Sequence, residues 1–257
     1  MVLCGYIRQR WDCGDTVEIE EKHTGKYGAR GQTREKKRKA TPEEIKKHNQ
    51  WKRERDVRRL IKWNFRERDY WITLTYPKDY RPTWEEMKDH AGKLVRKMRE
   101  KYKKQGWTLK YIYRLAIGSR GGRHIHILIN RESNEKTATD LIITDLWEQQ
   151  WGHGHVNFRT TYSEGGYKQL AEYLTKPLEE WEPDEVKRYH PSRNLIRKDP
   201  EVDEIKRRSL VDRDGKPRMP KAPKGYYVDP ESIEVGINPI THYAYRHYTL
   251  IKIKKRE

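Results

Sequence analysis

The sequence predicts an α+β fold, an antiparallel sheet of about five strands with helices mainly on one face, flanked by N- and C-terminal extensions. Between residues 65 and 180, short runs alternate apolar and polar residues, as half-buried strands do. Longer runs with apolar residues three and four positions apart lie between them, as in amphipathic helices. Two of the predicted strands are joined by a Gly-rich turn, which favours a hairpin and therefore antiparallel pairing.

The composition indicates a folded and strongly basic protein. The 257 residues include 57 Lys and Arg against 39 Asp and Glu, a net charge of +18. Nine Trp and 17 Tyr make the chain far too aromatic for a disordered polycation. This combination favours a polyanionic partner, with nucleic acid as the leading candidate. A basic protein with merely solvated charged faces is the alternative, which charge alone does not exclude.

Cysteine content and hydropathy favour a cytoplasmic protein without a membrane partner. Cys4 and Cys13 are too few for a disulfide framework, and their spacing does not suit a zinc knuckle. No apolar run approaches the length of a membrane span. Arg8 and Arg10 place charge where a signal peptide would be apolar.

Residues 1–64 are predicted to form a basic N-terminal arm followed by a helix. Thr41 is suited to the N-cap, and Glu44 completes a capping box. The helix is expected to run to about Asn64. Cationic residues outnumber acidic ones over residues 34–68, which favours a surface that follows DNA phosphates over a simply solvated face.

Residues 65–180 are predicted to form the core domain. Thr83 and Glu86 mark a second capping box, and Pro77 ends the strand before it. The expected elements in order are a strand at 70–76, a helix at 84–105, strands at 108–117 and 123–130, a helix at 138–151, a strand at 155–160 and a helix at 166–176. Residues 181–257 contain charged loops and Tyr-rich strand-like segments, and are predicted to form an extension docked on this core.

Two histidines lie one residue apart in the apolar run "RHIHILIN". Side chains alternate along a strand, so His124 and His126 share one face while isoleucines occupy the other. Their Cα atoms would lie about 7 Å apart, close enough for both imidazoles to bind one cation. By itself the pair is weak support for a metal site, because a second pair, His153 and His155, occurs in a glycine turn.

A tyrosine and a lysine occur three residues apart on the last predicted helix of the core. At this spacing Tyr173 and Lys176 can face one pocket, where a cation eases attack by the phenol. The alternative is that Tyr173 packs against leucines while Lys176 is a helix-end cation. Arg120 and Arg123 flank the histidines, where they either clamp a DNA backbone or belong to a solvated turn.

These motifs in this order resemble the HUH endonucleases. The strand "WITLTYP", the strand with two histidines and the helix "KQLAEYLTKP" are most similar to the single-tyrosine rolling-circle replication initiators of bacterial plasmids and phages. The segments "GDTVEIEEKHTGKYGARG", "SRNL" and "GINPITHYAYRHYTLIKI" extend the resemblance over nearly the whole chain.

The resemblance implies an HUH fold and sequence-specific nicking and joining of single-stranded DNA at a replication origin. His124 and His126 would bind Mg²⁺ or Mn²⁺, and Tyr173 would attack the scissile phosphate to form a 5′-phosphotyrosine. Lys176 would orient the phosphate or a metal-bound water. The implied partners are origin DNA with an adjacent hairpin, and the host helicase and replication machinery. The implied setting is the bacterial cytoplasm, on a mobile element.

One residue departs from the pattern of these initiators. They usually carry an acidic metal ligand on the strand before the histidines, and the matching position is Ala116. Mg²⁺ prefers oxygen ligands, so two imidazoles alone would hold it weakly. Three alternatives remain open: a third ligand from elsewhere, a related Tyr transposase or relaxase, and a catalytically weakened DNA-binding protein. Tyr167, six residues before Tyr173, is the second candidate nucleophile, but on a helix it would point away from the same site.

Overall fold

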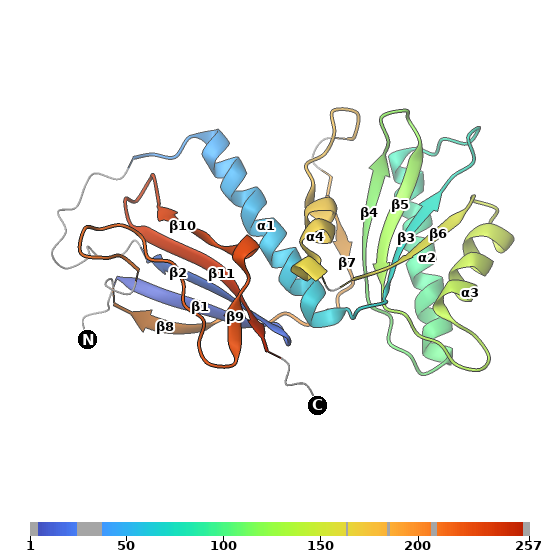
Figure 1. The fold of residues 1–257 in the computed structure, drawn as a ribbon. Helices are drawn as coiled ribbons and strands as arrows, with labels where there is room; N and C mark the ends of the chain where they lie inside the picture. The colour runs from blue at the N-terminus through green and yellow to red at the C-terminus, as the bar shows by residue number, and fades with distance from the viewer. Residues whose placement is uncertain (1–4, 25–37, 163, 184–185, 207–209, 254–257) are drawn as a thin grey trace. The chain divides into compact units, whose positions relative to one another are not determined.

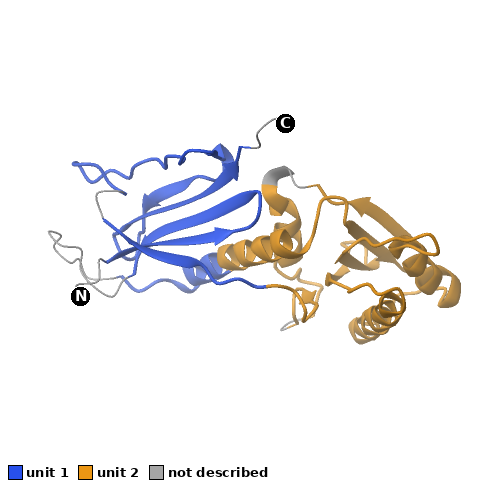
Figure 2. Cartoon of the chain, turned by 90° about the horizontal axis from the view of Figure 1, so that it is seen from below, with its two compact units in different colours: residues 1–49, 197–257 blue, residues 50–196 orange. Residues whose placement is uncertain are grey.

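The protein has an α+β fold, as predicted, and its chain divides into two compact units (Figure 2). Unit 1 combines residues 1–49 with residues 197–257, and unit 2 comprises residues 50–196. The computed structural model describes residues 5–24, 38–162, 164–183, 186–206 and 210–253. None of the helices in these ranges is long and apolar enough to cross a membrane.

Unit 2 is built on a five-stranded antiparallel sheet in the order β6-β3-β5-β4-β7 (Figure 1). Its strands are β3 (Tyr70–Thr75), β4 (Tyr111–Ile117), β5 (Arg123–Ile129), β6 (Val156–Thr160) and β7 (His190–Pro191). β4 and β5 form the predicted hairpin, and β5 also pairs with β3. The strand with the two histidines is therefore central, with a neighbour on each side.

Helices cover both faces of this sheet, whereas the sequence predicted them mainly on one (Figure 1). On one face lie α2 (Trp84–Lys104) and α3 (Thr139–Thr144), which continues as a π-helical turn. On the other lie the C-terminal half of α1 (Pro42–Asn64) and the short α4 (Lys168–Thr175). The chain places the histidine-bearing side of the sheet toward α4.

The apolar alternation of the strands explains the two cores. Ile72, Leu74, Ile125 and Ile127 point toward α2 and α3 and are fully buried there. Each such side chain contributes about 1.5–3 kcal/mol to the free energy of unfolding. A smaller cluster forms on the other face, where Leu128 packs with residues of α1 and α4. Both predicted capping boxes are present, at Thr41 with Glu44 and at Thr83 with Glu86.

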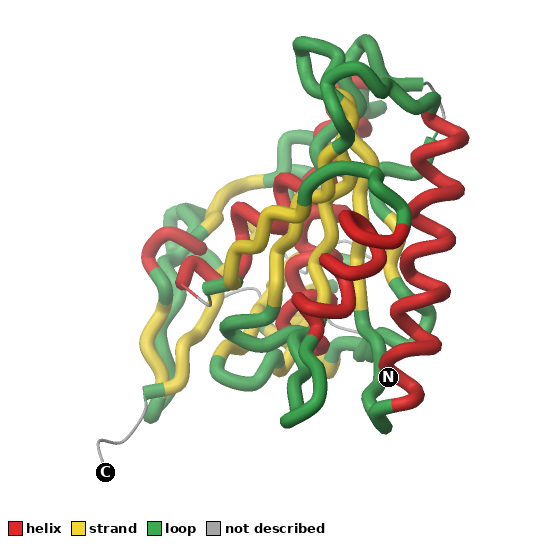
Figure 3. The backbone as a smooth tube through the Cα atoms, turned by 90° about the vertical axis from the view of Figure 1, so that its right-hand side faces the viewer, coloured by secondary structure: helices red, strands yellow, loops and turns green. Residues whose placement is uncertain are grey.

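Unit 1 is a second antiparallel sheet, formed from both ends of the chain (Figure 3). The strand order is β10-β11-β2-β1-β8, and β9 also pairs with β11. The bounds are β1 (Tyr6–Asp12), β2 (Thr16–His23), β8 (Glu201–Ile205), β9 (Tyr226–Val228), β10 (Glu234–Ile237) and β11 (Ala244–Lys252). A short 3₁₀ turn lies at Pro230–Ser232.

This division differs from the predicted domain boundaries. The segment predicted as an N-terminal arm forms two strands, and β2 pairs with β11 from the far end of the chain. The predicted extension, residues 181–257, is shared between units: its first part belongs to unit 2 and residues 197–257 to unit 1. Such pairing joins segments distant in sequence through backbone hydrogen bonds, which local patterns do not reveal. Residues 34–37 of the predicted phosphate-following surface lie outside the described residues.

Candidate active site

The two histidines line one face of the central strand β5. Antiparallel register aligns each of them with a residue on both neighbouring strands. His126 lies between Thr73 and Arg114, and His124 lies between Thr75 and Ala116. The two imidazole centroids are 4.7 Å apart, so the strand brings the rings together as predicted.

His126 has one ring nitrogen engaged and one free. Its Nδ1 lies 3.1 Å from Thr73 Oγ1, while its buried Nε2 has no hydrogen-bond partner among the described residues. Burial lowers the pKa of His126 to about 3, with smaller contributions from the charges of His124 and Arg114. The ring is therefore neutral at pH 7, and with Nδ1 as the donor to Thr73, Nε2 carries a lone pair.

His124 is less buried than His126 but is also held in place. It forms a hydrogen bond with the backbone of Gly122. Burial lowers the pKa of His124, and this outweighs the hydrogen bond and the charge of Glu182. Each imidazole thus has a partner that orients it, which is the usual arrangement around metal-binding histidines.

Tyr173 on α4 reaches the histidine face of the sheet. Its ring centroid is 4.9 Å from that of His126 and 5.6 Å from that of Trp71, nearly perpendicular to both. The residue is still 37% exposed, so its phenol is accessible. Burial raises the pKa of Tyr173, and the positive charge of Arg114 partly offsets this. The fold therefore brings together three of the predicted site residues, the two histidines and the tyrosine.

Lys176 follows the last residue of α4 and does not join this group. Its ammonium forms an ion pair with Glu179, and the side chain is about half exposed. Its backbone carbonyl accepts a hydrogen bond from Arg114. The catalytic role expected for the Lys176 side chain stays a prediction.

Tyr167, the second candidate nucleophile, is packed in the core. It lies at the N-cap of α4 with φ of 62°, and it is 9% exposed. Its neighbours are residues of α1, β4 and β5, among them Leu60, Ile112 and Leu128. Burial raises the pKa of Tyr167 to about 12, which makes phenolate formation harder.

The two arginines beside the histidines differ in their surroundings. Arg120 is exposed in the hairpin turn. Arg123 is half-buried, and its guanidinium donates to the carbonyls of Pro82 at 3.2 Å and Gly121 at 2.7 Å. The Arg123 side chain therefore braces the hairpin turn against the segment before α2, while Arg120 remains available to a ligand.

No acidic residue takes the place expected for a third metal ligand. Ala116 is buried opposite His124 and offers only a methyl group. Asn130 lies at the far end of β5, where its amide bonds Lys110 and Thr108. Within the described ranges, no group of three or more His, Cys, Asp or Glu residues is arranged to hold a metal ion.

The second histidine pair does not converge. The ring of His153 stacks at 4.1 Å on that of His90 from α2, whereas the side chain of His155 is 93% exposed. This agrees with their position in a glycine turn, where side chains do not alternate as they do on a strand.

The sequence analysis did not identify Arg114 and Glu182 as site residues. Arg114 is only 3% exposed and lies on the histidine face, with its guanidinium carbon 6.0 Å from the Tyr173 ring centroid. A single cation within the apolar run "YIYRLAI" was the available signal, because a buried charge requires a partner. That partner is Glu182, itself buried, from a charged loop without any pattern.

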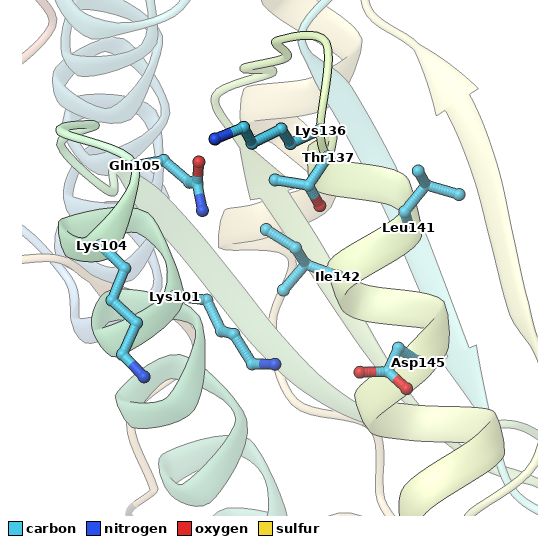
Figure 4. Close-up of a pocket in the computed structure, with 8 residues that line it drawn as sticks. All are labelled: Lys101, Lys104, Gln105, Lys136, Thr137, Leu141, Ile142 and Asp145. Carbon is cyan, nitrogen blue, oxygen red and sulfur yellow. The ribbon is translucent and has the colours of Figure 1, made fainter.

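A cavity of about 360 Å³ opens elsewhere in unit 2, between α2 and α3 (Figure 4). It is lined by Lys101, Lys104, Gln105, Lys136, Thr137, Leu141, Ile142 and Asp145. Because α2 and α3 cover the opposite face of the sheet from the histidines, this cavity is separate from the candidate site.

Comparison with known proteins gives one match. Residues 69–178 match a family of replication-associated proteins, described as the replication-associated protein ORF2 family. This span runs from just before β3 to just after α4, and so contains His124, His126 and Tyr173. No curated protein and no solved structure matches the chain. The part of the chain that forms the candidate site is therefore similar to a family of replication-associated proteins.

Proposed function

We propose that this protein initiates rolling-circle replication by nicking and rejoining single-stranded DNA at an origin. The observation that carries the proposal is the contact between the accessible Tyr173 ring and His126, 4.9 Å apart, within a segment similar to replication-associated proteins. The net charge of +18 suits a polyanionic substrate.

The proposed reaction is a transesterification. Tyr173 Oη bonds to the scissile phosphorus while the bond to the 3′ oxygen breaks, and the phenol proton is lost as the released 3′-OH gains one. The product is a 5′-phosphotyrosine, which retains a phosphodiester-type bond. A later 3′-OH can attack it and join strands, so neither step needs nucleotide hydrolysis.

His124 and His126 fit a divalent cation, Mg²⁺ or Mn²⁺. The fit rests on the buried His126 Nε2, which has no hydrogen-bond partner among the described residues, and on two imidazoles held by neighbouring groups. A cation bound there supplies charge stabilisation at the scissile phosphate. Since Ala116 contributes no oxygen, the remaining ligands come from water or the DNA, and binding without DNA is weak.

The remaining basic residues have graded roles in this proposal. Arg120, exposed in the hairpin turn, contacts the DNA backbone. Lys176 orients the phosphate only after its ammonium leaves Glu179. Arg123 acts indirectly, by bracing the turn. The DNA strand at the origin carries an adjacent hairpin, and the host helicase and replication machinery act after the nick, in the bacterial cytoplasm.

A second candidate function is DNA binding without nicking. The observation in its favour is Ala116, which lies directly across from His124 where an acidic ligand is expected. In this case the scaffold would hold DNA while the metal site is too weak for catalysis.

Formation of an SDS-resistant protein–DNA adduct tests the proposal. The protein is mixed with Mn²⁺ and single-stranded DNA spanning the replicon that carries its gene. We expect an adduct with the wild type, a larger yield with Ala116→Glu, and none with Tyr173→Phe. Tyr167→Phe keeps the packed ring and is the matched control, which should retain the adduct.

Two results would contradict parts of the proposal. An adduct that persists in Tyr173→Phe but is lost in Tyr167→Phe would reassign the nucleophile. If neither the wild type nor Ala116→Glu forms an adduct with any divalent metal while both bind the DNA, the function is binding alone.

A further inference from the structure

Side chains from outside the helix cap the C-terminal end of α4. The last carbonyls of a helix lack partners within it and must bond elsewhere. Arg114 Nη1 donates to the carbonyl of Tyr173 at 3.2 Å and to that of Lys176 at 2.7 Å. The carbonyl of Thr175 accepts from Gln50 and Arg188, each at 3.1 Å. Two cations thus lie at the negative end of the helix dipole, where they are stabilising.

Arg114 is tied in turn to the segment that follows α4. Its Nη2 forms an ion pair with Glu182 Oε2 at 3.4 Å, and the two side chains are almost completely buried. Glu182 also accepts from the backbone N–H groups of Ile117 at 3.2 Å and Glu179 at 3.0 Å. Trp181 Nε1 donates to the carbonyl of Ile117 at 2.8 Å. Both backbone groups of one β4 residue are thus held by this segment.

The same arginine lies beside the reacting side chain. Arg114 aligns with His126 in the β4–β5 register, and its guanidinium carbon is 6.0 Å from the centroid of the Tyr173 ring. It therefore contacts the backbone of Tyr173 as well as approaching its ring. This arrangement relates the position of the phenol on α4 to that of the imidazole on β5.

We propose that Arg114 and Glu182 are a positioning pair that holds the Tyr173 phenol over His126 for attack on DNA. This inference rests on the proposed function. α4 has only eight residues, and a helix this short depends on tertiary contacts for its order. Misplacing a reacting group by about 1 Å can lower a rate by about 100-fold. A pair that served stability alone would leave the rate per folded molecule unchanged.

Arg114→Lys tests the pair while keeping its positive charge. Lysine cannot present two parallel donor groups to several carbonyls, as the guanidinium does. We expect the rate of adduct formation at saturating DNA to fall about 100-fold, with the Kd for the same DNA within about twofold of wild type. Glu182→Gln keeps the size and one acceptor and should lower the same rate by a smaller factor, about tenfold.

The chain offers a matched control in unit 1. There Arg246 pairs with the fully buried Glu21, so Glu21→Gln removes the same charge from a similar environment. We expect it to reduce the stability of unit 1 and to leave the adduct rate unchanged. Equal rate losses in Glu21→Gln and Glu182→Gln would overturn the proposal.

Hydrogen exchange of the α4 amides separates this inference from the proposed function. We expect faster exchange over residues 168–175 in Arg114→Lys and unchanged exchange there in Glu21→Gln. Unchanged α4 exchange in Arg114→Lys, or faster exchange with an unchanged adduct rate, overturns the positioning role. Absence of an adduct in the wild type would contradict the proposed function instead, and the exchange result would still show whether the pair orders the helix that carries Tyr173.

Discussion

The Ala116 methyl group is the residue that most limits the proposed metal site. It lies opposite His124 on β4 and is 7% exposed, so its surroundings leave it in contact with the histidine face. His126 offers a buried nitrogen lone pair, but Mg²⁺ and Mn²⁺ prefer oxygen ligands. Coordination by protein groups is thus incomplete in this chain.

Replacing this residue by glutamate is expected to strengthen metal binding. Ala116→Glu adds a carboxylate beside two neutral imidazoles, and we expect the Kd for Mn²⁺ to fall by about tenfold or more. Isothermal titration calorimetry without DNA measures it. Ala116→Gln, of similar size but uncharged, is the control and should give a smaller change. An equal Kd in Ala116→Glu and wild type, with both folded, would contradict the assignment of the histidine face as a metal site.

At the scale of elements, α2 is linked to the loop before β6 by two stacked imidazoles. His90 of α2 and His153 of the loop have ring centroids 4.1 Å apart, and Tyr76 Oη lies 3.1 Å from His90 Nδ1. Burial lowers the pKa of His153 to about 4, and the charges of His90 and Lys93 lower it further. Burial also lowers the pKa of His90.

These shifts predict that acid weakens this contact. In the unfolded chain a histidine gains its proton near pH 6.5, whereas folded His153 gains it only near pH 4. As pH falls from 6.5 to 4, the unfolded chain therefore binds more protons, and the free energy of unfolding falls. Above pH 6.5 the contribution of His153 is complete.

Urea unfolding between pH 7 and pH 4 measures this effect. His153→Asn should show a smaller decrease in the free energy of unfolding over that range than the wild type. His155→Asn, at a side chain that is 93% exposed, is the control and should follow the wild type. Identical pH dependence in wild type and His153→Asn would refute the predicted linkage.

For the whole molecule, charge is expected to govern DNA affinity. Binding of single-stranded DNA releases counterions, so log Kd should change linearly with log salt by about 0.7 per phosphate contact. The exposed lysines Lys46, Lys47 and Lys52 of α1 belong to the basic surface predicted from the sequence. Changing all three to Gln should reduce the slope by about 2, as three lost contacts require.

Fluorescence anisotropy with a labelled oligonucleotide at several salt concentrations measures these slopes. The matched control changes Lys101, Lys104 and Lys136 to Gln, which removes the same charge around the cavity between α2 and α3. We expect the control to alter the slope less. Equal slopes in wild type and the α1 variant would show that this helix does not contact DNA phosphates.

Local patterns in the sequence were sufficient for most of unit 2. The apolar alternation at β3 and β5, the Gly-rich hairpin turn and the two capping boxes depend on residues close in the chain. For that reason the order of strands and helices between residues 65 and 180 was predictable. Unit 1 was not, because its buried β2 strand contains Glu18, Glu20 and Glu21, and such acidic residues are unusual in a buried strand.

The sequence by itself determined the basic charge, the α+β class, the placement of His124 and His126 on one strand face and the candidacy of Tyr173. Only the tertiary structure decided that the Tyr173 ring meets His126, that Lys176 pairs with Glu179, and that Arg114 and Glu182 join β4 to the end of α4. The physical reason is that strand alternation and helix caps are encoded by neighbouring residues. In contrast, a buried ion pair forms between groups 68 positions apart, and only the packed chain brings them together.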